Sequence, residues 1–454
     1  MTLKDGMDLA SAGALETAAA VRAGDVSALE ACDAAIARIE ARDEPINAVV
    51  VRDFERARAA AKHIDKTRQP GDARPLLGVP MTVKESNDVA GLPTTWGMDV
   101  FKDLPVEEDA VVVARLKAAG AVILGKTNAP VALADWQTEN PVYGRTVNPF
   151  DPARSPGGSS GGAAAALASG MVALEIGSDI GGSIRIPAHM CGVFGHKPTY
   201  GVVPAKGHGF PGTDGVDVPL AVVGPMARNT RDLAAAIDVI AGPQAGAGYR
   251  LDLPAARHDS LADYHVLVLD HLPNLSADAD TRAAVAGLAD AMAEAGADVS
   301  DDTGLLPDLR QMHETYVKML NTVIMRGAPG ARPVDAHEWM ELVDEQMRTI
   351  RAWRDVFETF DVIIAPAFST PAFPYQTDPD WSNRTLMIDG KQTAYGAQLA
   401  WAGLATFPGL PSTCTPVARS EQGLPIGLQV IGAPYGDRTT LGFAGLLEAA
   451  GLTL

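Results

Sequence analysis

Cysteine is scarce in this sequence: the 454 residues contain three, Cys32, Cys191 and Cys414, and they are far apart. Without a CxxC pair or an even-numbered set, neither a disulfide framework nor a structural zinc site is expected. Residues 1–8 carry two aspartates and no apolar segment, so we expect no signal peptide. No uncharged apolar run approaches the ~18 residues of a membrane span. The sequence therefore predicts a reduced, soluble, cytoplasmic protein.

Positive charge is also in short supply, with 37 Lys and Arg against 56 Asp and Glu and a formal net charge of −19. The average field would repel a phosphate backbone, so we expect no nucleic-acid partner. Aromatic residues make up 6% of the chain, whereas apolar residues as a whole make up 47%. This balance predicts a globular protein whose large core is packed from small and aliphatic side chains.

Short apolar runs alternate with helical patterns over most of the chain. Strands are predicted at 79–83, 121–124, 172–176, 266–269, 297–300 and 362–366, and helices at 28–42, 109–119, 163–169, 280–295, 309–325 and 338–357. This alternation is typical of an α/β architecture with a largely parallel or mixed sheet. We expect a helical N-terminal lead-in at 1–70 and a catalytic domain at 71–454. Within that domain the core would span about 77–240 and a helical, variable part about 260–400.

Two glycine-flanked serine clusters are the most informative feature: GGSSGG at 157–162 and GSDIGGS at 177–183. Glycines let the backbone approach a ligand closely, and successive N–H groups in such a turn can bind a developing oxyanion. The alternative is a flexible Gly-Ser loop. The second cluster follows an apolar strand and precedes Arg185 and Pro187, which favours a rigid turn.

The first cluster also fits G-x-S-x-G, the nucleophile elbow of α/β-hydrolases. An elbow needs a strand directly before it, but three prolines lie within 148–156 and no histidine is well placed as a base. Lys84, at the end of the apolar run 79–83, is the candidate base instead. Partial desolvation would lower its pKa and leave a neutral amine. The alternative for Lys84 is a snorkelling surface residue.

With these features the chain resembles the amidase signature family, whose hallmark is a Ser–cis-Ser–Lys triad, and in particular its stand-alone bacterial members that hydrolyse aryl amides and urethanes. The matching residues are Thr138, Asn140, Tyr143, Gly144, Thr146, Asn148, Pro149 and Arg154 before the clusters, Gly192, Gly195, Lys197, Pro198, Thr199 and 224–228 after them, and 409–411 and 423–429 near the C-terminus. The resemblance implies an α/β fold with a mixed central sheet covered by helices on both faces.

The resemblance also assigns roles to individual residues. Ser183 would be the nucleophile, Ser159 on a cis peptide the bridging serine, and Lys84 the base. The oxyanion hole would be formed by the backbone N–H groups of Ile180, Gly181, Gly182 and Ser183. Hydrogen bonds that hold the triad would come from Ser160, Ser178, Asp179 and Arg185. The mechanism implied, acyl transfer through an acyl-enzyme, needs no metal or organic cofactor.

Substrate choice depends on the variable regions. Trp96, Trp136 and Gln137 are the candidate substrate-binding residues, and their apolar setting favours a small carboxamide, anilide or carbamate (urethane). A first alternative is the glutaminase subunit of a tRNA-dependent amidotransferase, which shares the signature. A second is a non-catalytic binding protein that retains the fold. We expect a monomer or homodimer.

Overall fold

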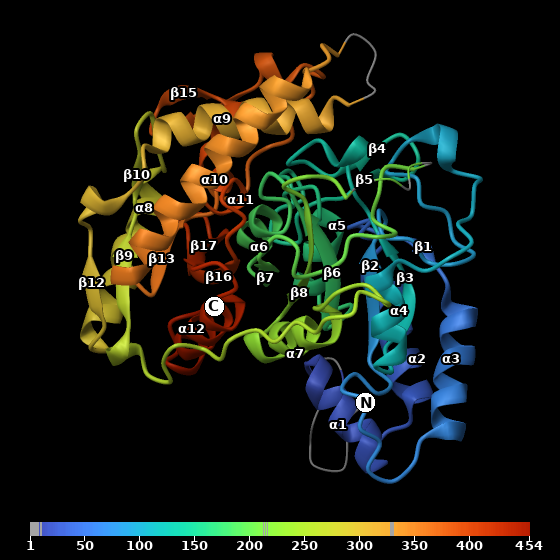
Figure 1. Ribbon diagram of the computed structural model, residues 1–454. Coiled ribbons are helices and arrows are strands. Elements are labelled where there is room, and N and C mark those ends of the chain that lie inside the picture. Colours follow the sequence, from blue (N-terminus) through green and yellow to red (C-terminus); the bar gives the residue numbers. More distant parts are fainter. Residues whose placement is uncertain (1–8, 10, 212, 214, 216, 327–330) are drawn as a thin grey trace.

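A mixed sheet of eight strands runs through the molecule (Figure 1). The computed structural model describes residues 9, 11–211, 213, 215, 217–326 and 331–454. In spatial order the strands are β12 (Asp298–Ser300), β9 (His265–Val268), β13 (Val362–Pro366), β17 (Pro425–Gly432), β16 (Ser412–Arg419), β7 (Phe194–Lys197), β8 (Val222–Ala227) and β6 (Leu174–Asp179). Strand β9 is parallel to β12 and β13, and the other neighbours are antiparallel. The mixed sheet of the α/β prediction is confirmed.

A smaller sheet of three strands lies against β6 and carries Lys84. Its order is β1 (Val49–Arg52), β3 (Val122–Thr127) and β2 (Pro80–Lys84), with β2 parallel and β1 antiparallel to β3. Strand β2 contacts β6 of the large sheet. The two sheets therefore meet where Lys84 ends its strand.

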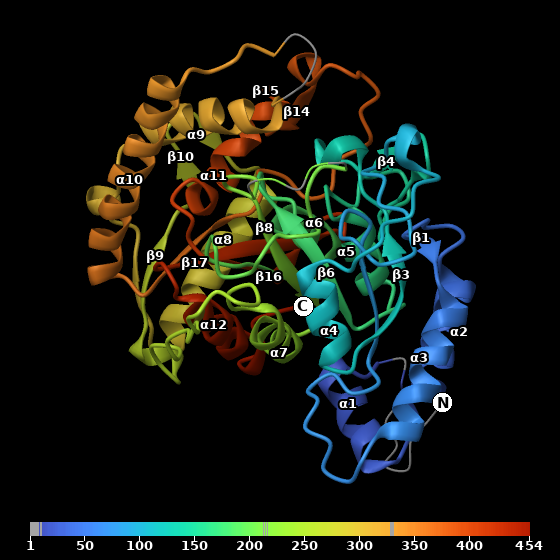
Figure 2. The same ribbon diagram turned by 45° about the vertical axis from the view of Figure 1, so that its right-hand side comes forward.

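The N-terminal lead-in consists mainly of helices, α1 (Ala14–Ala23), α2 (Ala28–Arg42) and α3 (Phe54–Thr67). Its strand β1 joins the smaller sheet, so the lead-in packs onto the main body rather than standing apart. Figures 1 and 2 show these helices in blue at one end of the molecule. Residues 1–8 of the expected lead-in lie outside the described residues.

Helices cover both faces of the large sheet, as alternate residues of β13 show. Val362 and Ile364 pack with α8 (Ala279–Glu294) and α12 (Asp437–Ala449). Ile363 and Ala365 face the other way, into a core with α9 (Leu309–Ile324), α10 (Ala336–Thr359) and α11 (Leu399–Thr406). The variable part thus supplies helices and also adds β9, β12 and β13 to the sheet.

The other half of the sheet is covered in the same way. Helices α4 (Val111–Ala118) and α7 (Thr230–Ile240) pack in one core with Leu174 and Ile176 of β6. Helices α5 (Gly161–Ala168) and α6 (Arg185–Cys191) pack in another with α2 and α3. Helix α5 is buried except at its last residue and contains only glycine, alanine and one leucine, which lets it lie close to its neighbours.

Short elements complete the fold. The remaining strands are β4 (Glu139–Asn140), β5 (Gly144–Arg145), β10 (His271–Leu272), β11 (Leu275–Ser276), β14 (Thr385–Ile388) and β15 (Lys391–Ala394). The 3-10 turns are η1 (Asp99–Phe101), η2 (Val131–Leu133), η3 (Leu261–Asp263), η4 (Thr303–Leu305), η5 (Trp381–Asn383) and η6 (Tyr395–Gln398). In the described part of the chain, every helix is too short or too polar to cross a membrane.

Candidate active site

Lys84 ends strand β2 with its side chain completely buried. Its Nζ donates hydrogen bonds to Ser159 Oγ at 2.6 Å and to Ser178 Oγ at 2.9 Å. Burial lowers the pKa of Lys84 to about 7, although the charges of Asp179 and Glu175 act to raise it. Near neutral pH a substantial share of the amine is therefore unprotonated and can accept a proton. The surface alternative for Lys84 is excluded by this burial.

Ser159 lies just before helix α5, and the Gly158–Ser159 peptide bond is cis. Glycine is required on its N-terminal side because the chain passes very close to other backbone there. A Cβ on Gly157, whose φ is +84°, would lie 2.6 Å from Pro187 Cα. A Cβ on Gly158 would lie 2.3 Å from the carbonyl oxygen of Asp135. The two glycines thus allow the chain to pack this closely beside Ser159.

Ser183 lies in the turn between β6 and α6 and is only 5% exposed. Its carbonyl oxygen accepts the Ser160 N–H at 3.1 Å, which ties the two serine clusters together. Among the described residues, none forms a hydrogen bond with Ser183 Oγ. The structure thus joins Lys84 to Ser159 directly and brings Ser183 beside them through the main chain, with its hydroxyl unengaged.

Ser160 and Ser178 connect the clusters a second time. Ser160 Oγ accepts the Ser178 N–H and donates to the Ser178 carbonyl, both at 3.3 Å. Ser178 Oγ in turn accepts from Lys84 Nζ. The first serine cluster, the second cluster and the lysine therefore form one hydrogen-bonded unit.

Asp179, the last residue of β6, organises the turn that carries Ser183. Its carboxylate accepts the N–H groups of Gly182 at 2.9 Å and Ile184 at 3.0 Å. It also accepts two hydrogen bonds from the Arg185 guanidinium, at 2.9 and 3.0 Å, in a fully buried pair. Burial acts to raise the pKa of Asp179, but Arg185 outweighs it and lowers the pKa to about 2. The carboxylate is therefore ionised at neutral pH.

Arg185 connects this turn to the C-terminal part of the chain. Its guanidinium donates to the Ala402 carbonyl at 3.1 Å, to Gln429 Oε1 at 2.8 Å and to Thr406 Oγ1 at 2.8 Å. These partners lie on α11 and β17. The position of Ser183 is consequently fixed by elements that follow it by more than 200 residues.

The four backbone N–H groups expected to form the oxyanion hole lie in this turn, and one of them is already engaged. The carbonyls of Ile180 and Gly181 accept from the Tyr316 hydroxyl and from Trp136 Nε1, both at 2.8 Å, which fixes the peptide planes. Gly182 N–H is already engaged by Asp179, so it is not a free donor for an oxyanion. The N–H groups of Ile180, Gly181 and Ser183 donate to no other described residue. Three of the four expected donors are therefore open.

We expect Asp179→Asn to destabilise the protein strongly, because it leaves the Arg185 charge buried without its counter-charge. Removing one partner of such a pair costs about 3–5 kcal/mol, which thermal or urea unfolding would measure. Asp99→Asn is the control, since Asp99 pairs with Lys102 at the surface and such pairs contribute less than about 1 kcal/mol. Equal effects of the two substitutions would contradict the role given to Asp179.

The chain is similar in sequence to a known protein family. The chain matches the protein family described as Amidase over residues 30–325 and 311–441. It is 32% identical over 461 residues to the indoleacetamide hydrolase of Bradyrhizobium diazoefficiens, covering 96% of this chain and 86% of that protein. It is 34% identical over 472 residues to a glutamyl-tRNA(Gln) amidotransferase subunit of Roseiflexus castenholzii, covering 92% and 91%. The chain belongs to the amidase signature family.

A solved structure agrees with this assignment. A bacterial aryl acylamidase of the amidase signature family superposes with a TM-score of 0.81 at 25% sequence identity, covering 97% of this chain and 96% of that one. The protein is an amidase, a hydrolase that acts on amides.

Two of the three candidate substrate-binding residues are engaged within the amidase itself. Trp136 is 2% exposed, and its indole N–H donates a hydrogen bond to the Gly181 carbonyl. Gln137 is 4% exposed, and its amide pairs with the backbone of Gln376, accepting at 2.6 Å and donating at 3.1 Å. Both therefore position the site in this structure instead of presenting their polar groups to a substrate.

Trp96, the third candidate, belongs to an aromatic cluster near Lys84. Its ring lies 5.6 Å from that of His208 and 5.7 Å from that of Phe210. Its loop is held by Glu85, a buried carboxylate that accepts the N–H groups of Thr95 at 2.6 Å and Trp96 at 3.0 Å. Glu85 was not predicted from the sequence, although an acidic residue directly after the candidate base Lys84 was an available signal.

His208 is not a competing base. Its Nε2 lies 3.0 Å from Ser86 Oγ in a buried setting. Burial lowers the pKa of His208 to about 3, and the charge of Lys84 acts in the same direction. An imidazole whose conjugate acid is that strong is a poor proton acceptor at neutral pH. Lys84, with a pKa of about 7, is a much stronger base than His208.

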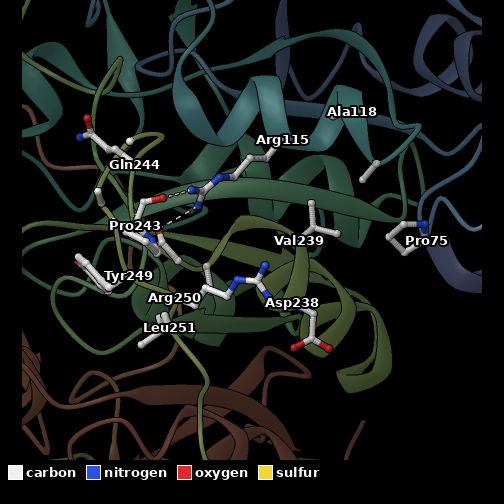
Figure 3. A pocket seen from close by; sticks show the side chains of 16 residues that line it. Pro75, Arg115, Ala118, Asp238, Val239, Pro243, Gln244, Tyr249, Arg250 and Leu251 are labelled. Atoms are coloured by element: carbon white, nitrogen blue, oxygen red, sulfur yellow. Dashed lines mark hydrogen bonds between the residues drawn. The ribbon is translucent and has the colours of Figure 1, made fainter.

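Two further features lie apart from the group formed by Lys84, Ser159 and Ser183. Among the described residues no group of three or more His, Cys, Asp or Glu side chains is placed to hold a metal ion. An open hollow of about 880 Å³ lies between α4, the end of α7 and the loop 241–251 (Figure 3). Arg115 bridges it by donating to the carbonyl of Gly242 at 3.1 Å. Lys84, Ser159 and Ser183 do not line this hollow.

Proposed function

We propose that this amidase is a serine-type enzyme that forms an acyl-enzyme on Ser183. The observation that carries the proposal is the buried Lys84 Nζ, 2.6 Å from the hydroxyl of Ser159 on its cis peptide, next to Ser160, whose N–H bonds the Ser183 carbonyl. Lys84 is buried enough to be a base near pH 7. A hydroxyl between an amine and a nucleophilic serine is suited to passing a proton in both directions.

The chemistry then runs in two halves. On substrate binding the Ser183 hydroxyl turns to Ser159, which takes its proton while giving its own to Lys84. Ser183 Oγ attacks the carbonyl carbon, and the open N–H groups of Ile180, Gly181 and Ser183 bind the oxyanion. The proton returns through Ser159 to the leaving nitrogen, and the C–N bond breaks. Water repeats the sequence on the acyl-enzyme and releases the acid.

We propose a small, apolar carboxamide, anilide or carbamate as the substrate. Apolar side chains border the turn: a Cβ on Gly181 would lie 3.3 Å from Leu399 Cδ2, and one on Gly182 would lie 3.4 Å from Ala402 Cβ. A charged substituent of the substrate would lose its hydration against these apolar side chains, which is unfavourable for binding. The likeness to an indoleacetamide hydrolase and an aryl acylamidase supports aromatic amides within this class.

A glutaminase subunit is the second candidate, and the Roseiflexus relative favours it. A non-catalytic binding protein is less favoured, because the Lys84–Ser159 contact is intact. We further propose a cytoplasmic monomer or homodimer that needs no cofactor and binds no nucleic acid. The three buried free cysteines and the net charge of −19 support this.

The purified chain alone should hydrolyse an aromatic amide or anilide in the presence of EDTA. We expect kcat/KM for an aryl acetamide or anilide to exceed that for glutamine by at least roughly tenfold, since the glutamine ammonium and carboxylate must be desolvated. Product release from an aliphatic amide, an anilide, a nitrophenyl carbamate and glutamine would be compared, with Ser183→Ala as background. Activity on glutamine alone, and only with a companion protein, would favour the glutaminase of an amidotransferase.

A further inference from the structure

Glu175 is a buried carboxyl group whose charge acts on Lys84. It lies on β6, three residues before Ser178, and its side chain is completely buried. Oε2 accepts the N–H of Ile176 at 2.8 Å. Oε1 makes no hydrogen bond to any described residue. Burying a carboxylate with so little compensation is unfavourable by several kcal/mol, so an apolar side chain would serve this core position better if packing were its only role.

The surroundings of Glu175 lead directly to Lys84. Thr82 Oγ1 on β2 and Thr127 Oγ1 on β3 are buried and, among the described residues, also lack a hydrogen bond of normal geometry. Both hydroxyls are nevertheless close enough to Glu175 to lower its pKa. Thr82 precedes Lys84 by two residues on β2, and Thr127 is the register partner of Lys84. The Glu175 carboxyl therefore lies at the interface between β6 of the large sheet and the small sheet that carries Lys84.

The other groups that face Lys84 are already engaged. Ser159, from the start of α5, and Ser178, from β6, supply hydroxyls without charge. The Asp179 carboxylate is paired with Arg185. His208, from the loop after β7, is uncharged at neutral pH. In the described chain, Lys84 is the one cation that acts on the Glu175 carboxyl.

We propose that Glu175 is a positioning residue for Lys84, supplying the counter-charge for the ammonium that Lys84 becomes when it takes the serine proton. The inference rests on the proposed serine mechanism. No bond to Glu175 forms or breaks. The proton of Ser183 reaches Lys84 Nζ through Ser159, the ammonium lies beside the carboxylate, and the ammonium is neutral again once the proton passes to the leaving nitrogen.

The titration of Glu175 agrees with this arrangement. Burial raises the pKa of Glu175 to about 7, while Thr82, Thr127, the Ile176 N–H and Lys84 act to lower it. The carboxyl and the amine therefore change protonation over the same range of pH and act on each other. Glu175 raises the pKa of Lys84. Removing the charge of Glu175 must therefore lower that pKa and make the protonated form of Lys84 less stable.

The test measures the rate of Ser183 labelling by a fluorophosphonate, and of amide turnover, against pH. For Glu175→Gln the acid limb of the pH–rate profile should move to lower pH by about one unit, because a nearby opposite charge shifts a pKa by about that much. The plateau of turnover should fall about tenfold, the equivalent of one pKa unit of ammonium stability. Glu175→Asp, which keeps the charge, should restore the wild-type limb. Glu175→Ala removes the same charge with a smaller side chain and must move the limb in the same direction.

Asp437→Asn is the matched control, since Asp437 is a buried carboxylate bonded to His196 and Thr199 and does not act on Lys84. It should lower the melting temperature and leave the limb in place. A limb that stays in place in both Glu175→Gln and Glu175→Ala, or that moves equally in Glu175→Asp, overturns the role of Glu175. Absence of Ser183 labelling in the wild-type amidase would instead overturn the proposed serine mechanism.

Discussion

Replacing Ser183 by alanine should abolish amide turnover and covalent labelling by a fluorophosphonate, while the protein keeps its fold. In the proposed mechanism Ser183 Oγ is the atom that attacks the carbonyl carbon, and among the described residues it makes no hydrogen bond that would hold it back. Loss of a nucleophile costs roughly 10⁴-fold or more in kcat. The removed oxygen makes no hydrogen bond to the described residues, so the fold loses little. Intact-mass spectrometry would detect the label, and thermal unfolding would report stability.

Two neighbouring serines are the controls for this result. Ser160→Ala should still be labelled, because Ser160 Oγ bonds the Ser178 backbone and faces no substrate. Ser159→Ala should be labelled slowly, because the relay is broken but the nucleophile is present. Labelling that persisted in Ser183→Ala and disappeared in Ser159→Ala would transfer the nucleophilic role to Ser159.

The local elements of this amidase could be predicted because their signals are local. A cap at Ser27 and an apolar period predict helix 28–42, and α2 spans Ala28–Arg42 with Ser27 accepting the Glu30 N–H. The predicted run 79–83 is β2 at Pro80–Lys84, and the predicted helix 309–325 is α9 at Leu309–Ile324. Helix caps and the spacing of apolar residues depend on only a few neighbouring residues, so both can be recognised from the sequence alone.

The order of the strands could not be predicted in the same way. Strand β13 lies between β9 and β17, partners that are distant in the chain, and that choice depends on packing between whole layers. In the sequence, strand β1 is only a short apolar run inside a helical lead-in, yet it pairs with β3. A run of four residues carries too little periodicity to distinguish an isolated turn from a strand.

The site was predictable where the motif itself brings residues together and was missed where distant elements complete it. The family resemblance placed Lys84 and Ser159 together, and the structure joins them. It offered Gly182 as an oxyanion donor, but whether Asp179 takes that N–H depends on how the turn closes. A tryptophan in a sequence is only a large apolar residue, so the bond from Trp136 to the Gly181 carbonyl could not be foreseen.

Lys84→Ala should lower kcat/KM for amides by about 10³-fold or more and remove the acid limb of the pH profile. Acting as a general base contributes about 10²–10⁴-fold, and His208, with a pKa of about 3, is too weak a base to replace Lys84. In the wild type, burial lowers the pKa of Lys84 to about 7. Below that pH the amine is protonated and inactive, so the acylation rate should rise as pH increases through about 7 and then level off.

The type of substrate gives this prediction a second, sharper readout. An amine leaving group must receive the proton that Lys84 holds, whereas the nitrophenolate of an activated ester can leave without it. A matched pair, an anilide and the nitrophenyl ester of the same acid, should therefore lose activity unequally, with the anilide affected more. Lys126→Met is the control for removing a buried lysine, because Lys126 bonds Thr94 and has no contact with either triad serine. It should leave the limb near pH 7 unchanged. Equal losses for the anilide and the ester would restrict Lys84 to the attack step, and a nearly active Lys84→Ala would place the base elsewhere.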